Sequence, residues 1–170
     1  MCSFMPQHFL AKAALIFLAA FVVLATPAPV AADPAEQVLV AVNSIRAKAG
    51  CGPLKFNAKL LAAARLHAKN MAEKDFFDHR GKDGRGFASR LRAYGYKYRF
   101  AAENIAAGQP TVQRAVQAWM GSPGHRRNIL DCKFRETGIA MVYQPDDRPL
   151  KGQRGSLRYY WVQEFGVQRP

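Results

Sequence analysis

The chain has 170 residues, of which 49% are hydrophobic and 22% are charged. This composition is typical of one globular domain with an apolar core, and the length excludes two domains of ordinary size. The formal net charge of +13 favours an anionic environment such as phospholipid headgroups, lipopolysaccharide, acidic wall polymers or nucleic acid. Because the basic residues are spread along the sequence, a solvated basic surface without a single partner is an equally good interpretation.

Residues 1–32 have the pattern of a secretory signal peptide. A weakly basic start precedes an uninterrupted apolar run over 13–24, and small residues with prolines follow it up to Ala32. The run has 12 residues, whereas a helix needs ~20 to span a bilayer, so export is favoured over a permanent anchor. We predict cleavage after Ala32, a secreted or periplasmic location, and a mature domain over 33–170 with charge +12 and no transmembrane segment.

Only Cys51 and Cys132 of the three cysteines remain after this cleavage. Two cysteines in an exported domain most simply form one disulfide bond. A bridge across this separation would contribute on the order of 4 kcal/mol to stability through the unfolded state. Two free buried thiols are the alternative, and metal ligation by an isolated pair at this separation is disfavoured.

The first half of the mature chain predicts three helices. The first runs over 34–50 with Asp33 as its cap, and the second begins after the cap residue Asn57 and buries one side. His67 lies on that buried side, so we interpret it as a core histidine with a backbone or carboxylate partner. A short third helix is predicted over 87–94.

The second half of the chain predicts strands. The stretch 100–107 is small and apolar except for Glu103 and the asparagine after it, and it is expected to form a short strand. Strands are also predicted over 137–144 and 157–167, and they are expected to pair as a hairpin with a long basic connection. This order predicts an α+β domain with helices packed against a small antiparallel sheet.

A helix capped by Thr111 separates the first strand from the hairpin. The sequence Ser122-Pro123-Gly124 breaks this helix, because proline lacks a backbone donor and glycine tolerates positive φ. We predict that the break presents His125 on a forced turn between the buried anchors Trp119 and Ile129-Leu130. A histidine held in this way is a candidate binding or catalytic group.

Four motifs in this order resemble the CAP superfamily, which groups cysteine-rich secretory proteins, antigen 5 and plant pathogenesis-related proteins with bacterial SCP-domain relatives. The similarity covers roughly 36–167, and the chain resembles the bacterial members most. It implies an α-β-α sandwich with a central cleft that two histidines and acidic residues line. The motifs are FFDH at 76–79, AENI at 102–105, WMGSPGHRRNIL at 119–130 and YWVQEFG at 160–166.

The resemblance assigns the cleft residues one by one. The two cleft histidines match His79 and His125, and the first cleft acid matches Glu103. The second acid of the family stands three residues after the tryptophan, where this sequence has Ser122 instead. The resemblance also implies that a divalent metal in the cleft is a recurring theme and that some eukaryotic relatives bind sterols or other lipids.

These residues allow three chemical interpretations. His79 and His125 with one carboxylate could bind zinc and leave an open position, as catalytic zinc sites do. Alternatively, the same groups form a hydrogen-bonded cluster that holds two parts of the fold together, and we favour this interpretation. A hydrolase of peptide or cell-wall substrates would use Glu103 as general base, and in either case Ser122 is interpreted as a polar residue at a helix C-terminus rather than a nucleophile.

A binding module is therefore the favoured function, and a metal-assisted hydrolase is the alternative. The basic loops over 80–85 and 148–154 are expected to dock on anionic lipid, lipopolysaccharide or cell-wall polymer. A stripe of arginine, lysine and tyrosine over 90–99 resembles a nucleic-acid surface in composition, but export makes nucleic acid the weaker partner. We expect a monomer.

Overall fold

The structure is a computed structural model that describes residues 1 and 33–170. The predicted apolar run, together with the cleavage point after Ala32, lies outside the described residues. Across 33–170, no helix has both the length and the hydropathy that crossing a bilayer requires. The helices are α1 (Pro34–Lys48), α2 (Ala58–Glu73), α3 (Phe87–Ala93), α4 (Val112–Gly121) and α5 (Pro123–Leu130). The strands are β1 (Lys55–Phe56), β2 (Tyr98–Ala107), β3 (Glu136–Tyr143) and β4 (Tyr159–Gln168).

The three predicted helix caps are confirmed. The Asp33 carboxylate accepts a hydrogen bond from the Ala35 backbone N–H at 2.9 Å, which satisfies one of the free donors at the start of α1. Asn57 accepts from two backbone N–H groups of α2 in the same way. Thr111 accepts from Arg114 N at 3.3 Å and begins α4. Local sequence therefore determines where these helices start.

The strands form one sheet in the order β1-β3-β4-β2 within the described part of the chain. The predicted hairpin is confirmed, because β3 and β4 pair antiparallel from Glu136 opposite Gly166 to Tyr143 opposite Tyr159. β2 pairs antiparallel with β4 only, so it is an edge strand. The sheet is not purely antiparallel as predicted, because β1 pairs parallel to β3.

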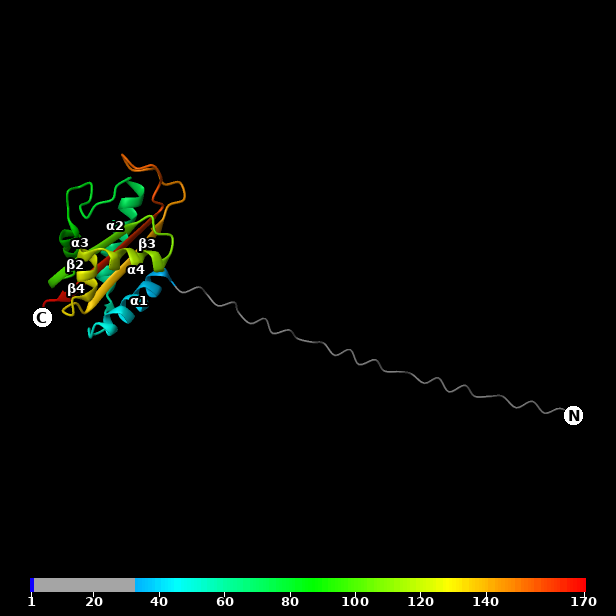
Figure 1. Ribbon diagram of the computed structural model, residues 1–170, viewed down its shortest axis with the longest axis horizontal. Helices are drawn as coiled ribbons and strands as arrows, with labels where there is room; N and C mark the ends of the chain where they lie inside the picture. Colours follow the sequence, from blue (N-terminus) through cyan, green and yellow to red (C-terminus); the bar gives the residue numbers. More distant parts are fainter. Residues whose placement is uncertain (2–32) are drawn as a thin grey trace. The chain divides into compact units, whose positions relative to one another are not determined.

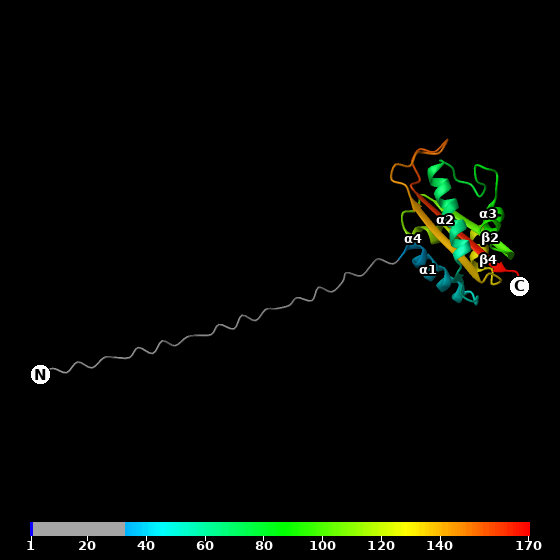
Figure 2. The same ribbon diagram turned by 180° about the vertical axis from the view of Figure 1, so that it is seen from behind.

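Helices cover both faces of this sheet, which confirms the predicted α-β-α sandwich. α2 packs on β3 and β4 with α3 beside it, whereas α1, α4 and α5 pack together against the other face (Figures 1 and 2). Trp161 and Phe165 of β4 belong to the core under α1 and α4, and the alternate residues Tyr160 and Val162 belong to the core under α2. Most of β4 is therefore buried on both sides.

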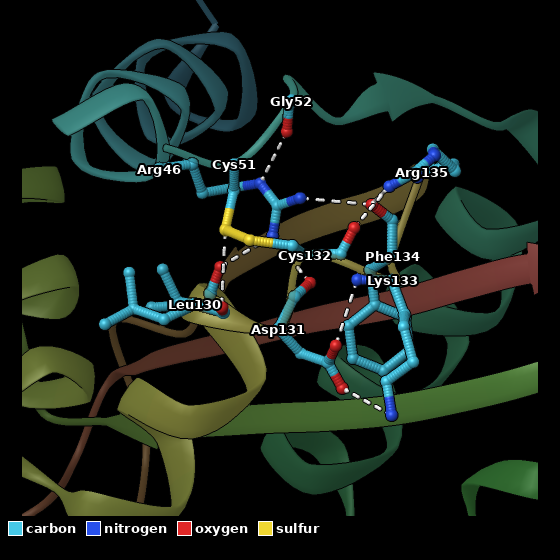
Figure 3. The surroundings of a disulfide bond; sticks show 10 residues. Arg46, Cys51, Gly52, Leu130, Asp131, Cys132, Lys133, Phe134 and Arg135 are labelled. Atoms are coloured by element: carbon cyan, nitrogen blue, oxygen red, sulfur yellow. Dashed lines mark hydrogen bonds and ion pairs between the residues drawn. A yellow bond between two sulfur atoms is a disulfide. The ribbon is translucent and has the colours of Figure 1, made fainter. Parts of the chain in front are cut away.

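The predicted disulfide bond between Cys51 and Cys132 is confirmed, and it lies beside a buried arginine (Figure 3). Arg46 of α1 is fully buried and donates hydrogen bonds to the backbone of two segments. Its acceptors are the carbonyl oxygens of Gly52 at 3.0 Å, Ile129 at 2.7 Å, Asp131 at 3.0 Å and Phe134 at 3.0 Å. The disulfide and this guanidinium together fasten the end of α1 to the connection between α5 and β3.

Candidate functional site

Glu103 lies at the centre of the predicted site and is almost completely buried in β2, with a side chain that is 1% exposed. One carboxylate oxygen accepts a hydrogen bond from His79 Nδ1 at 2.7 Å. The other accepts from Arg90 Nη2 at 2.5 Å and lies 4.0 Å from His67 Nε2. The structure therefore brings together Glu103 and His79, as the family resemblance implied, and adds two residues that were not predicted for the site.

His79 belongs to the connection between α2 and α3, and its side chain is 50% exposed. Because a carboxylate can only accept, the bond to Glu103 requires the proton of His79 to be on Nδ1. The outer nitrogen, Nε2, has no partner among residues 33–170. His79 therefore offers a free imidazole edge to solvent while its inner edge is fixed.

Arg90 of α3 is buried, and its hydrogen bonds hold both Glu103 and the backbone of His79. Besides Glu103, its guanidinium donates to the carbonyl oxygens of His79 at 3.0 Å and Arg85 at 3.3 Å. The sequence analysis placed Arg90 in an exposed stripe of basic and aromatic residues, and this was wrong. Tyr96 of the same stripe is also buried and donates to Glu136 at 2.6 Å, so the stripe is not one continuous surface.

Glu164 of β4 is directly opposite Glu103 in the β2–β4 ladder and is fully buried. Neither of its carboxyl oxygens accepts a hydrogen bond from a donor in the described part of the chain. Burial raises the pKa of Glu164 well above its usual value, and the adjacent Glu103 carboxylate raises it further. The raised pKa favours the protonated form of Glu164, whose O–H can donate to the Glu103 carboxylate.

The pKa of Glu103 moves in the opposite direction. Burial alone would raise it, but the hydrogen bond from His79 and the positive charge of Arg90 bring it below its usual value. Glu103 is thus a permanent anion at neutral pH. A carboxylate with a lowered pKa is a weak base, which disfavours the general-base role considered above.

His67 of α2 completes the buried group. Its Nε2 donates to the Asp78 carbonyl oxygen at 2.9 Å, and burial lowers its pKa to about 4, so the ring is neutral at pH 7. The interpretation of His67 as a buried histidine with a backbone partner is confirmed. His67 also lies next to Glu103, a neighbour that the sequence had not identified.

His125 approaches from the opposite layer of the sandwich. Its carbonyl oxygen accepts a hydrogen bond from Asn104 Nδ2 at 3.2 Å, and Asn128 Nδ2 donates to Asn104 Oδ1 at 2.9 Å. Partial burial lowers the pKa of His125, and the charge of His79 lowers it further, so the two imidazoles are within electrostatic reach. His79 lies on the side of α2 and α3 and His125 lies in α5, so the two residues approach β2 from opposite faces of the sheet.

The local structure around His125 differs from the prediction. Pro123 begins α5, so His125 lies in the first turn of a helix and not on an irregular turn. A proline at the first helical position is well tolerated, because its missing N–H has no partner there. Trp119 and Ile129 are fully buried, as predicted, whereas Leu130 is only half-buried.

Ser122 separates α4 from α5 and is half-buried. Its carbonyl oxygen accepts from Arg126 N at 2.9 Å, whereas its hydroxyl makes no capping hydrogen bond. Its position at the C-terminus of a helix agrees with the sequence interpretation. No hydrogen bond connects Ser122 to the side chains of Glu103 or His79 within residues 33–170.

The zinc hypothesis was tested against the arrangement of ligand-type side chains. Among the described residues, no three His, Cys, Asp or Glu side chains are placed so that they could hold a metal ion. The carboxylate of Glu103 is already engaged by His79 and Arg90. The residues therefore do not fit a three-ligand catalytic zinc site, and metal binding by His79 and His125 stays a prediction.

The site could be found only in part from the sequence. Arg90 carried no signal, because a basic residue in a short helix is usually exposed. Glu164 carried a clear signal, because it is the single acidic residue in β4, whose other residues are mostly buried. Glu103 stands out in β2 in the same way. The same argument that singled out Glu103 would have found its partner.

Known proteins resemble this chain in sequence and in fold. The protein YkwD of Bacillus subtilis is 34% identical over 141 residues, which are 82% of this chain and 50% of that protein. An extracellular SCP-domain protein of Bacillus anthracis superposes with a TM-score of 0.66 at 24% identity, over 80% of this chain and 40% of that one. An outer surface protein of Borrelia burgdorferi gives a TM-score of 0.69 at 19% identity, over 79% of this chain and 92% of that one.

This chain spans about half the length of the curated relative YkwD. Its residues 39–165 match the Cysteine-rich secretory protein family, CAP, which covers more than half of the sequence. The fold described above is shared with the SCP-domain protein of Bacillus anthracis and with the outer surface protein of Borrelia burgdorferi. The chain therefore belongs to the CAP family.

Proposed function

We propose that this CAP-family protein is an exported module that binds anionic material of the cell envelope, with the imidazoles of His79 and His125 as contact groups. One observation carries the proposal. Glu103 and Arg90 fix the inner edge of His79, while its outer nitrogen and both ring nitrogens of His125 have no partner within residues 33–170. The fixed imidazole of His79 and the free ring nitrogens of His125 offer donors and acceptors that a polar ligand can use.

Binding is favoured over hydrolysis by the state of the buried group. The carboxylate of Glu103 is saturated by His79 and Arg90, and its pKa is lowered. Glu164 is protonated but fully buried, so it has no access to a substrate. The group therefore supports the imidazole of His79 and joins the sheet to the helices α2 and α3, which is the role favoured from the sequence.

Export is supported by three independent features. The disulfide bond is typical of oxidising compartments, and a structurally similar protein of Bacillus anthracis is described as extracellular. The mature charge of +12 suits attraction to acidic envelope polymers and lipids. Cleavage after Ala32 is tested by intact mass spectrometry of the protein recovered from the envelope fraction, where the expected first residue is Asp33. A full-length mass would contradict it.

The binding proposal is tested with the double variant His79→Gln/His125→Gln. Because both histidines count as neutral at pH 7, this change leaves the formal net charge unaltered. Co-sedimentation with isolated cell-wall polymer, lipopolysaccharide and anionic vesicles is compared for the wild type and the variant. We expect the variant to lose most retention on the binding material while circular dichroism shows the native fold. Equal retention of both proteins would reject the histidines as contact groups.

A matched charge variant separates specific contact from general attraction. Arg148→Gln/Lys151→Gln/Arg154→Gln removes three exposed cations from the loop between β3 and β4. Retention that depends on these cations alone should fall in this variant and in added salt, whereas retention through the histidines should survive the substitution. If the charge variant loses retention and the histidine variant does not, then retention is due to nonspecific electrostatic attraction.

A further inference from the structure

A small hollow lies at the end of the sheet where β2 begins. It has a volume of about 160 Å³ and is lined by Arg92, Lys97, Tyr98 and Arg169. Arg92 is in the last turn of α3, Lys97 directly precedes β2, Tyr98 is its first residue, and Arg169 directly follows β4. Three cations from separate elements therefore surround one small space.

Neutral partners hold the two guanidinium groups in place. Arg92 donates to the Tyr98 hydroxyl at 3.0 Å and to Ser89 Oγ at 3.2 Å. Arg169 donates through Nε to the Tyr98 carbonyl oxygen at 2.9 Å, and its backbone N–H pairs with Lys97 O at 2.9 Å. Because a guanidinium has five N–H donors, both arginines keep several donors free after these bonds.

None of the three cations forms an ion pair with a carboxylate of residues 33–170. Other surface cations do, as in the pairs Lys69–Glu73, Arg85–Asp83 and Lys133–Asp131. Three uncompensated positive charges around one hollow repel each other, and an anion placed between them would remove that cost. The space between these three cations is therefore a favourable place for an anion.

Further positive charge adjoins this end of β2. The ring of Phe100 is 40% exposed, and it has Arg99 Cζ at 5.2 Å and Lys133 Nζ at 5.1 Å from its centre. The nearby carboxylate of Glu136 accepts hydrogen bonds from the side chains of Tyr96, Asn57 and Gln168. Lys133 is paired with Asp131, so Arg99 is the cation that adds to the positive charge near the hollow.

We propose that the hollow formed by Arg92, Lys97, Tyr98 and Arg169 binds a phosphate group. The forked donors of two arginines match the oxygens of a tetrahedral anion, a lysine adds a point charge, and the Tyr98 hydroxyl keeps its proton to donate. The hollow uses none of the residues assigned to the histidine site. The result of its test is therefore independent of the function proposed above.

The test is a titration of the full chain with inorganic phosphate, followed by two-dimensional NMR of arginine side-chain and backbone amide groups at constant ionic strength. We expect saturable shifts at Arg92, Tyr98 and Arg169 that chloride does not produce. The variant Arg92→Gln/Lys97→Gln/Arg169→Gln should weaken binding by about tenfold or more, since each lost charge-assisted hydrogen bond is strong. Tyr98→Phe removes only the hydroxyl and should cause a smaller loss.

The loop variant Arg148→Gln/Lys151→Gln/Arg154→Gln is the matched control, because it removes the same charge from exposed positions elsewhere. It should bind phosphate like the wild type. Equal weakening in the two triple variants, or no saturation in the wild type, would overturn the proposal. Glycerol 3-phosphate and phosphatidylglycerol vesicles then identify the source of the phosphate. Competition by the soluble ester alone supports a free phosphate compound, and retention on vesicles that requires the hollow supports a lipid headgroup.

Discussion

Glu103 and Glu164 face each other across the β2–β4 ladder, and both are buried in the layer beneath α2. Directly opposed residues in such a ladder have Cβ atoms about 5 Å apart, so two ionised carboxylates would repel each other strongly. Arg90 and His79 keep Glu103 ionised, and Glu164 keeps its proton. The pair titrates as one unit, in which one proton is held between two acids.

Replacing Glu164 by glutamine should make the stability less sensitive to rising pH. Folding raises the pKa of Glu164, so its contribution to the free energy of unfolding is complete below its ordinary pKa and falls as pH rises. The free energy of unfolding therefore falls by at most about 1.4 kcal/mol for each unit by which the pH rises. Urea unfolding of Glu164→Gln and wild type at about pH 5 and about pH 8 should show the variant gaining relative stability at the higher pH.

The control for this prediction is Glu73→Gln on the exposed side of α2. Its pH profile should run parallel to that of the wild type. Glu103 contributes with the opposite sign, because its lowered pKa stabilises the fold above its ordinary pKa and this contribution is lost on acidification. A Glu164→Gln profile parallel to the wild type would show that Glu164 does not hold a proton in the folded state.

Arg90 and Arg92 should differ sharply, although they are two residues apart on the same helix. Arg90→Met leaves the buried Glu103 carboxylate without its cation, and breaking a buried ion pair costs about 3–5 kcal/mol. Arg92→Met changes an exposed side chain and should cost less than about 0.5 kcal/mol. Denaturant unfolding measures both, and similar costs would contradict the buried role of Arg90.

A second substitution gives this prediction an internal check. If the cost of Arg90→Met comes from the unpaired carboxylate, then Glu103→Gln in the same chain should recover part of the stability. A double-mutant cycle over these two positions should therefore give a favourable coupling energy. Simple additivity would mean that Arg90 acts only through its bonds to the carbonyl oxygens of His79 and Arg85.

Gly138 should not tolerate alanine, because α2 packs directly on β3 at this position. A Cβ added there would overlap backbone atoms of Leu60 and Leu61, which a helix cannot move aside easily. Gly138→Ala should cost about 3 kcal/mol or more in thermal or denaturant unfolding. Gly155→Ala is the control, since a Cβ there meets nothing, and it should stay within about 0.5 kcal/mol of the wild type.

The disulfide and Arg46 should support the same junction independently. Reducing the bond between Cys51 and Cys132, which closes a sequence separation of 81 residues, should cost about 4 kcal/mol. The reduced protein should remain folded, because Arg46 still binds the carbonyl oxygens of the junction. Arg46→Lys loses the forked geometry, so this variant should unfold on reduction. Circular dichroism with and without reductant checks both, and a variant that stays native when reduced would contradict the role of Arg46.

The parts of the fold that could be predicted are those with local physical causes. The caps Asp33, Asn57 and Thr111 and the alternation of the two final strands depend on residues close in sequence. The pairing of His79 with Glu103 followed from the family resemblance alone, since their sequence separation carries no geometric information. The disulfide followed from the number of cysteines left in an exported domain.

The parts that could not be predicted depend on contacts between segments that are distant in the sequence. Arg90 looked like a surface cation until the structure placed a buried carboxylate opposite it. Glu164 was detectable as a lone acid in an apolar strand, but the sequence did not show that α2 covers its face of β4. The parallel pairing of β1 was also missed, because only two residues form it and they pair with a strand far along the chain.

The order of the strands sets a condition on how this chain acquires its shape during synthesis. Within the described residues, β4 occupies an inner place in the sheet and is the sole partner of β2, yet it follows the other three strands in the sequence. Before the ribosome releases residues 159–168, β2 has no strand to pair with and cannot join the pair formed by β1 and β3. Closure of the sheet therefore waits for synthesis to pass β4, and pairings between such distant segments make folding slow compared with a helical bundle of equal size.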